Sequence, residues 1–239
     1  MLATFLATLA FILVHLYTER LRFLHGTPRS RWLSMAGGVS VAYVFIHLLP
    51  ELARGQEVIE EARFDLLSYL EHHTYLLALS GLVCFYGLEQ AMKVHRRKLP
   101  PGAPPPSSVF WLHIASFSAY NVLIGYLLVH REEPGLGNLV LFTVALGLHF
   151  MVNDFGLQQD HKSLFRQRGR WVLSVAVLAG WALGQAIELS ELATSAAIAF
   201  LTGSVVLNVL KEELPEERES RFSAFLAGTV AYAALLLML

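Results

Sequence analysis

The sequence predicts an all-α membrane protein with eight transmembrane helices, because its composition, its apolar segment lengths and its charge distribution agree. Of the 239 residues, 55% are hydrophobic and only 15% are charged, whereas an ordinary soluble domain carries about 25% charged residues. A soluble fold with so few charges would expose large apolar surfaces to water, and a lipid bilayer removes that cost. The net charge of −1 gives no indication of a nucleic-acid partner.

Segment length gives the number of helices, since a helix needs about 20 mostly apolar residues to cross the hydrocarbon core. Eight stretches have this character and none resembles a soluble domain, so we expect a single transmembrane domain over residues 1–239. The eight helices are expected near residues 2–20, 32–51, 74–92, 109–130, 138–155, 171–189, 193–211 and 222–239.

The first helix and two connecting segments need separate interpretation. Residues Met1 to Tyr17 lack the positively charged start and the cleavage signal of a secretory signal peptide, so we expect them to remain as a helix. Residues 53–71 are acidic and compatible with a short amphipathic helix at the membrane interface. Residues 95–108 are basic and then proline-rich, which favours an extended linker.

Lysine and arginine residues indicate the orientation of the helices. The first, third, fifth and seventh loops carry 15 of the 18 lysines and arginines, and both termini carry none. By the positive-inside rule, these loops are cytoplasmic and both termini lie outside. The sequence therefore predicts a multi-pass protein of an inner or plasma membrane, with membrane lipid as its first partner.

A repeated tripeptide indicates internal symmetry. Helix 2 is expected to end in Leu49-Pro50-Glu51 on the outer side, and helix 7 in Leu214-Pro215-Glu216 on the inner side. If helices 1–3 and 6–8 are repeats, each tripeptide closes the second helix of its repeat, in opposite directions across the membrane. This pattern is typical of the inverted repeats of secondary transporters.

Polar side chains at membrane depth are the candidate site residues, because placing them in a bilayer is costly and they often mark a pathway. Helix 5 carries His149 and Asn153 on one face, followed by Asp154. An imidazole, an amide oxygen and a carboxylate together suit a borderline divalent cation such as zinc. The alternative is that His149 bonds a neighbouring helix while Asn153 and Asp154 cap the helix end.

Helices 4 and 2 add further polar groups. Helix 4 carries His113 and Tyr120 seven residues apart on one face, and Asn121, whose oxygen suits a hard or borderline cation. The alternative for Asn121 is a hydrogen bond that joins two helices. Helix 2 presents His47 and Glu51 at positions i and i+4 near its outer end, as an entry or relay site or as a solvated helix end.

Other ionisable residues and motifs carry less information. Glu19, Glu89 and the Lys211-Glu212-Glu213 cluster lie at expected helix ends near the inner face, where we expect them to reach water or to pair with loop arginines. The chain has no GxSxG, HExxH, Walker or CxxC motif, so we expect neither an enzyme nor an organic cofactor. Its single cysteine, Cys84, cannot form a disulfide within the chain.

The helix layout and three motifs resemble the ZIP family of divalent metal transporters. The motifs are His47-Leu-Leu-Pro-Glu51 in helix 2, Gly81-Leu-Val-Cys-Phe-Tyr-Gly-Leu-Glu89 in helix 3, and the stretch from Gly203 to Glu216 in helix 7. The resemblance covers essentially the whole chain. It implies a ZIP-like bundle in which the repeats, helices 1–3 and 6–8, surround helices 4 and 5, with the metal site between those two helices.

The chain departs from the metal-site pattern that the resemblance implies. A pattern like His-Asn-x-x-Asp-Gly in helix 4 matches Tyr120-Asn-Val-Leu-Ile-Gly125, which places Ile124 where the family has aspartate. A pattern like His-Glu-x-Pro-His-Glu in helix 5 matches His149-Phe-Met-Val-Asn-Asp154, which places Phe150 where the family has its first glutamate. Because bridging carboxylates are missing, we expect at most one metal site rather than two.

The leading hypothesis from the sequence is a ZIP-like carrier of a divalent metal cation, zinc or a neighbouring transition metal, with a reduced metal site. Two alternatives stay open: a non-transporting membrane scaffold or sensor with the ZIP fold, and a proton-coupled transporter of another solute with His113, Tyr120 and His149 as a relay. The divalent ion is the expected substrate and partner, and a homodimer is an open option. The candidate ligands are His149, Asn153, Asp154 and Asn121, with His47 and Glu51 for the outer approach.

Overall fold

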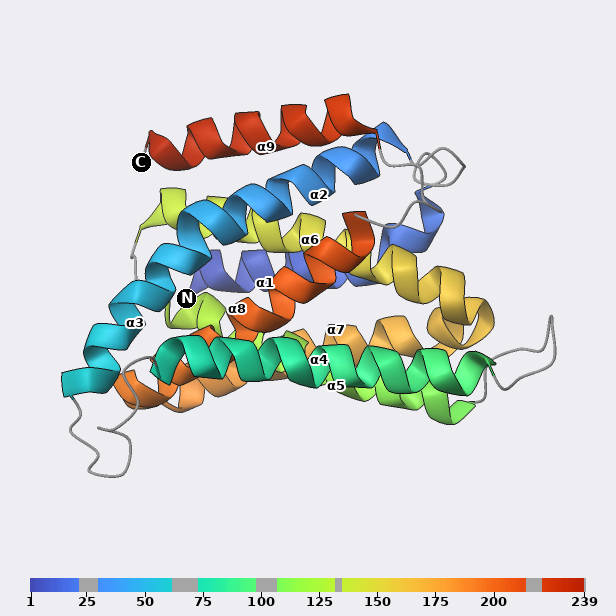
Figure 1. The fold of residues 1–239 in the computed structure, drawn as a ribbon, viewed down its shortest axis with the longest axis horizontal. Coiled ribbons are helices and arrows are strands. Elements are labelled where there is room, and N and C mark those ends of the chain that lie inside the picture. Colours follow the sequence, from blue (N-terminus) through green and yellow to red (C-terminus); the bar gives the residue numbers. More distant parts are fainter. Residues whose placement is uncertain (22–29, 62–72, 98–106, 132–134, 214–220, 239) are drawn as a thin grey trace.

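The computed structural model describes residues 1–21, 30–61, 73–97, 107–131, 135–213 and 221–238. Their regular structure is entirely helical (Figure 1), which confirms the all-α fold class. They form eight helical rods in the expected order. The rods are α1 (Leu2–Tyr17) with a 3₁₀ turn η1 (Thr18–Arg20); the continuous run of α2 (Arg31–Tyr43), η3 (Val44–Leu48) and α3 (Leu49–Glu61); α4 (His73–Arg97); α5 (Ser107–Val129); α6 (Leu136–Leu164) with η4 (Phe165–Gly169); α7 (Arg170–Ala186); α8 (Glu191–Glu213); and α9 (Phe222–Leu237).

Six helical stretches within the described ranges are long and apolar enough to cross a membrane. The other two rods are shorter, since α7 has 17 residues and α9 has 16. Length therefore supports six of the eight expected spans. These six are Leu2–Arg20, Arg31–Glu57, His73–His95, Ser107–Val129, Leu136–Gln159 and Glu191–Lys211.

Helix 2 continues past its expected end at residue 51 and reaches Glu61 without a break. Pro50 has no backbone N–H, and its ring crowds the carbonyl group of Ile46 in a regular α-helix. The chain relieves this conflict with a π-helical turn, η3, directly before the proline. The wider turn contains His47 and precedes Glu51, so the proline sets the position of both candidate residues.

Helix 5 also extends beyond its expected end. It was expected near 138–155, but α6 runs to Leu164. His161 breaks the regular geometry with φ −134° and ψ 41°, and the π-helical segment η4 then leads directly into α7. The basic segment expected to be a loop between helices 5 and 6 is therefore helical.

The helices pack as two groups. In the first helix group (α1, α5, α6 and α7), α5 packs against α7, and α1 packs against both α6 and α7. In the second helix group (α2, α3, α4, α8 and α9), α2 packs against α9 and α4 packs against α8. Figure 1 shows α2 and α9 side by side along one edge of the bundle. The largest contact between the groups joins α2 to α6.

Glycines let the paired helices approach until their backbones touch. A Cβ atom on Gly38 of α2 would clash with the carbonyl oxygen of Phe225 in α9, and one on Gly203 of α8 would clash with that of Ala78 in α4. Small residues in such positions are the usual means of close helix packing in membranes. Glycines with the same role are Gly228 of α9, Gly81 of α4, Gly125 of α5 and Gly180 of α7.

Several expected features fall outside the described residues. The second Leu-Pro-Glu tripeptide, residues 214–216, is among them, as are the end of the acidic segment, residues 62–71, and most of the proline-rich linker, residues 98–106. The first tripeptide is described and begins α3.

Candidate functional site

Six buried polar side chains from three helices of the first helix group meet inside the bundle. Each of them is at most 5% exposed. We call this set the central polar cluster. It contains His15 of α1, Tyr120 and Asn121 of α5, and His149, Asn153 and Asp154 of α6.

The first half of the central polar cluster is built around His149. The Tyr120 hydroxyl lies 2.8 Å from His149 Nε2 and donates to it. The Asn153 Nδ2 amide group, one helical turn further along α6, lies 2.9 Å from the same nitrogen. Because both neighbours point donors at Nε2, the imidazole accepts there and carries its proton on Nδ1. His149 is therefore a neutral acceptor.

The second half is built around His15, which lies between two acceptors. Asn121 donates its Nδ2 to the Phe117 carbonyl oxygen at 2.8 Å, and this bond fixes the side-chain amide with Oδ1 toward His15. His15 Nε2 lies 2.8 Å from that oxygen and donates to it. On the other side of the ring, His15 Nδ1 lies 2.8 Å from Asp154 Oδ2. Since the proton on Nε2 already points at Asn121, the hydrogen bond between Nδ1 and the Asp154 carboxyl group needs a second proton, which lies between these two groups.

Helix geometry explains why neighbouring residues join different histidines. Successive residues of an α-helix point about 100° apart. Tyr120 and Asn121 therefore diverge from α5, and Asn153 and Asp154 diverge from α6. The candidate ligands Asn121, Asp154, His149 and Asn153 thus lie on neighbouring positions of α5 and α6, and they belong to two hydrogen-bonded sets rather than one.

The cluster does not form a ready metal site. Within the described residues, no three histidine, cysteine, aspartate or glutamate side chains are arranged to hold a metal ion. Two of the three positions where the family pattern has carboxylates are filled by apolar core, and the third is Asp154. Phe150 packs its ring 4.8 Å from that of His15 and 5.1 Å from that of Phe11, and Ile124 is completely buried.

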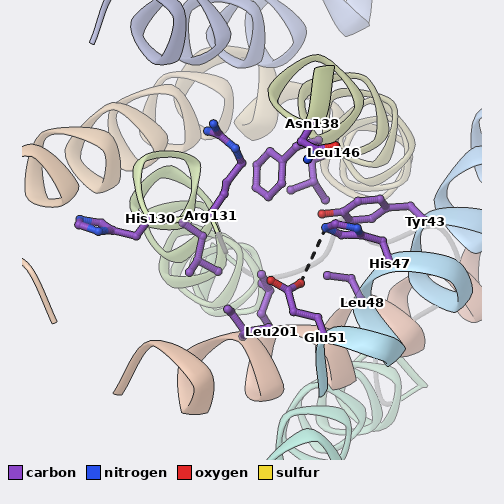
Figure 2. A pocket seen from close by; sticks show the side chains of 12 residues that line it. Tyr43, His47, Leu48, Glu51, His130, Arg131, Asn138, Leu146 and Leu201 are labelled. Carbon is purple, nitrogen blue, oxygen red and sulfur yellow. Dashed lines mark ion pairs between the residues drawn. The ribbon is translucent and has the colours of Figure 1, made fainter. Parts of the chain in front are cut away.

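His47 and Glu51 lie elsewhere, in a pocket between α2, α5, α6 and α8 (Figure 2). His47 Nε2 is 4.0 Å from Glu51 Oε2, which is an ion-pair distance when the histidine is protonated. The Tyr43 ring stacks on His47 at 5.0 Å. The free space is about 30 Å³, which is room for water molecules. We call it the outer pocket, after the side of the membrane on which the sequence predicts the end of helix 2. No residue of the central polar cluster lines it.

Arg131 is the charged residue on the opposite side of the outer pocket, as Figure 2 shows. Burial lowers the pKa of its guanidinium from the usual value, while the nearby Tyr43 acts in the opposite direction. The pocket therefore combines a partly desolvated cation with the carboxylate of Glu51. The positive charge of Arg131 opposes a tightly held metal cation in this pocket.

A third polar region, the inner polar cluster, lies toward the opposite ends of the same helices. Glu89 of α4 bonds Lys211 of α8 at 2.7 Å and lies 3.9 Å from His113 Nε2 of α5. His113 Nδ1 is in turn 2.9 Å from His161 Nε2. The relay expected from His113, Tyr120 and His149 is thus divided: Tyr120 bonds His149, whereas His113 bonds His161.

One of the helix-end carboxylates pairs as the sequence predicted. Glu19 lies 3.8 and 3.9 Å from Arg166 and Arg170, two arginines of the expected fifth loop. Glu89 instead pairs with Lys211, another helix-end residue. All three ion pairs join segments that are far apart in the chain.

His15 is the residue of the central polar cluster that the sequence analysis missed. A signal for it was present, since it is the only histidine in the first apolar stretch, and an ionisable residue at membrane depth is by default a functional candidate. It also continues the buried face formed by Thr8 and Phe11. Its pairing with Asn121 and Asp154 had no signal in the sequence, because that pairing is set by tertiary packing.

Comparisons with known proteins add no assignment, since no protein-family model, curated protein or solved structure matches this chain.

Proposed function

We propose that this chain is a multi-pass membrane carrier of a divalent cation, with zinc the favoured substrate, built on a ZIP-like architecture. The observation that carries the proposal is the central polar cluster. Three helices bring two imidazoles, one carboxylate and two amides together inside an apolar bundle. Nitrogen and carboxylate oxygen are the ligands that zinc and neighbouring transition metals prefer.

The apolar outer surface supports the membrane location. Large hydrophobic side chains on many helices are more than half exposed, among them Leu13 of α1, Val83 of α4, Val175 of α7 and Val230 of α9. Exposed apolar side chains on so many helices are unfavourable in water and favourable in lipid. Six helices of sufficient length and apolarity agree with it.

Helix pairing supports the inverted repeat. If α2 corresponds to α8 and α4 to α9, the close pair of α2 with α9 corresponds to that of α8 with α4. The sequence agrees, because 165 residues separate Leu49 from Leu214 in the two Leu-Pro-Glu tripeptides and the same 165 separate Gly38 from Gly203. Both glycines occupy the backbone contact of their pair. Repeats of opposite direction provide two related arrangements for alternating access.

Cation binding requires the cluster to exchange hydrogen bonds for metal bonds. His149 Nε2 has to release Tyr120 and Asn153, and Asp154 has to release His15. Asp154 supplies the single carboxylate, which offsets part of the cost of removing a divalent ion from water. The outer pocket, which contains His47 and Glu51, provides the cation with an approach to the cluster from the end of α5 and the start of α6.

A second candidate, a ZIP-fold membrane scaffold or sensor that transports nothing, is favoured by a different observation. The donors and acceptors of the central polar cluster already bond one another, and Phe150 and Ile124 fill two of the three positions where the family has carboxylates. A closed hydrogen-bonded network of this kind stabilises one arrangement of helices without any ion.

Zinc uptake into proteoliposomes separates these two functions. We expect uptake by the wild-type chain and a fall to the level of empty vesicles for His149→Ala. The matched control is His95→Ala, because His95 is exposed near the end of α4. Equal uptake by wild type and His149→Ala contradicts the proposed site. No uptake by any form, together with no saturable zinc binding in calorimetry, favours the scaffold.

A further inference from the structure

The inner polar cluster joins the two helix groups through charged and polar side chains. Glu89 of the second group bonds Lys211 within its own group and faces His113 of the first group. Lys93 also faces Glu89, at 3.7 Å. His113 bonds His161, the residue at which α6 departs from helical geometry. This junction therefore combines a carboxylate, two cations and two imidazoles.

Two buried polar atoms of the junction lack a hydrogen-bond partner among the described residues. They are Nε2 of His113 and Nδ2 of Asn208. His113 is 7% exposed and Asn208 is 4% exposed. An unsatisfied buried polar group is costly in an apolar environment, and native proteins usually satisfy it with ordered water. Both atoms therefore indicate hydration at this point.

The space for that water lies next to the two atoms. His113, Asn208 and Lys211 together line two small cavities, each of about 10 Å³. This is close to the least volume that holds one water molecule. Glu89 lines one cavity and Asn153 of the central polar cluster lines the other. The 3.9 Å gap between Glu89 Oε2 and His113 Nε2 is too long for a direct hydrogen bond and suits a bridging water.

We propose that these waters complete a proton relay that runs from Glu89 through water and His113 to His161. In one step, a protonated Glu89 gives its proton to the bridging water, and the water gives a proton to His113 Nε2. His113 releases its Nδ1 proton to His161 Nε2. The net result is the Glu89 carboxylate and a protonated His161, with His113 returned to a neutral tautomer. The reverse step restores the starting state.

The charges around the relay set its resting state. Lys211 and Lys93 face the carboxylate of Glu89, and they favour its ionised form. The cavities are too small for a hydrated divalent ion, so the relay goes beyond cation carriage and does not depend on it. It passes protons at the junction where the two helix groups meet.

The test measures proton entry into proteoliposomes that contain an internal pH dye, driven by a potassium diffusion potential with valinomycin. We expect the wild-type chain to acidify the lumen faster than empty vesicles do. The rate of acidification with His113→Phe, which removes both ring nitrogens, should fall to that of empty vesicles. His113→Gln, which keeps polarity without titrating, should do the same. His95→Gln should match wild type, because His95 is exposed and lies outside the junction.

Each result decides the proposal. Wild-type flux equal to that of empty vesicles, or equal flux by wild type and His113→Gln, overturns the relay. If His113→Phe fails to fold, as judged by its elution in detergent, His113→Gln and Glu89→Gln give the answer. Zinc uptake is measured in the same vesicles. Proton flux without zinc uptake supports the relay and contradicts the carrier. Zinc uptake without proton flux supports the carrier and overturns the relay.

Discussion

His149 and His15 have neighbouring partners on the same two helices, yet their hydrogen-bonding roles are opposite. His149 accepts at Nε2 from Tyr120 and Asn153. His15 lies between the oxygens of Asn121 and Asp154, and it donates from Nε2 while Nδ1 shares a proton with the carboxyl group. One residue of shift along each helix therefore exchanges a neutral acceptor site for a donor site.

The two histidines differ in the charge of their partners as well as in the direction of their hydrogen bonds. The His149 set contains only neutral groups, whereas the His15 set contains the only carboxylate of the central polar cluster. A charged group at membrane depth requires a partner, because the surroundings do not solvate it. His15 is that partner for Asp154, and both are 1% exposed. His15 therefore balances the charge of the cluster, whereas His149, a neutral acceptor, is the more available metal ligand.

The largest effect is expected from His15→Leu. It removes the partner of a buried carboxylate, and breaking a buried charge pair costs about 3–5 kcal/mol. The free energy of unfolding in detergent, measured by chemical denaturation, should fall by that amount. The double variant His15→Leu with Asp154→Leu should recover part of the loss, because no unpaired charge remains. Equal losses in the single and double variants would show that the pair does not act as a unit.

A smaller effect is expected from His149→Leu, since this change leaves two neutral donors without an acceptor. Loss of neutral hydrogen bonds inside a membrane protein costs about 1–2 kcal/mol in total. The same denaturation assay should place this variant clearly between wild type and His15→Leu. A loss as large as that of His15→Leu would mean that His149 is charged, which contradicts its role as a neutral acceptor.

Sequence patterns predicted the helices of this cluster better than its bonds. Apolar segment length predicted α5 and the first part of α6, because segment length and helical periodicity are local properties of the chain. The approach of these two helices was implied only by the family resemblance. The division of the ligands between two histidines was not predictable, since it depends on how α1 packs against α6. The π-helical turn at His47 had a local cause in Pro50, and so did the position of Glu51. The kink at His161 had no such signal.

The smallest effect is expected from Tyr120→Phe. The change removes one donor to His149 Nε2 while Asn153 keeps its bond to the same nitrogen, so the acceptor stays satisfied. Individual side-chain hydrogen bonds in a membrane protein contribute about 0.6 kcal/mol on average, and the unfolding free energy should fall by about that much. Zinc uptake should rise or stay equal, because His149 loses a competitor for its lone pair. A strong fall in uptake with unchanged stability would instead assign the Tyr120 hydroxyl a direct part in carriage.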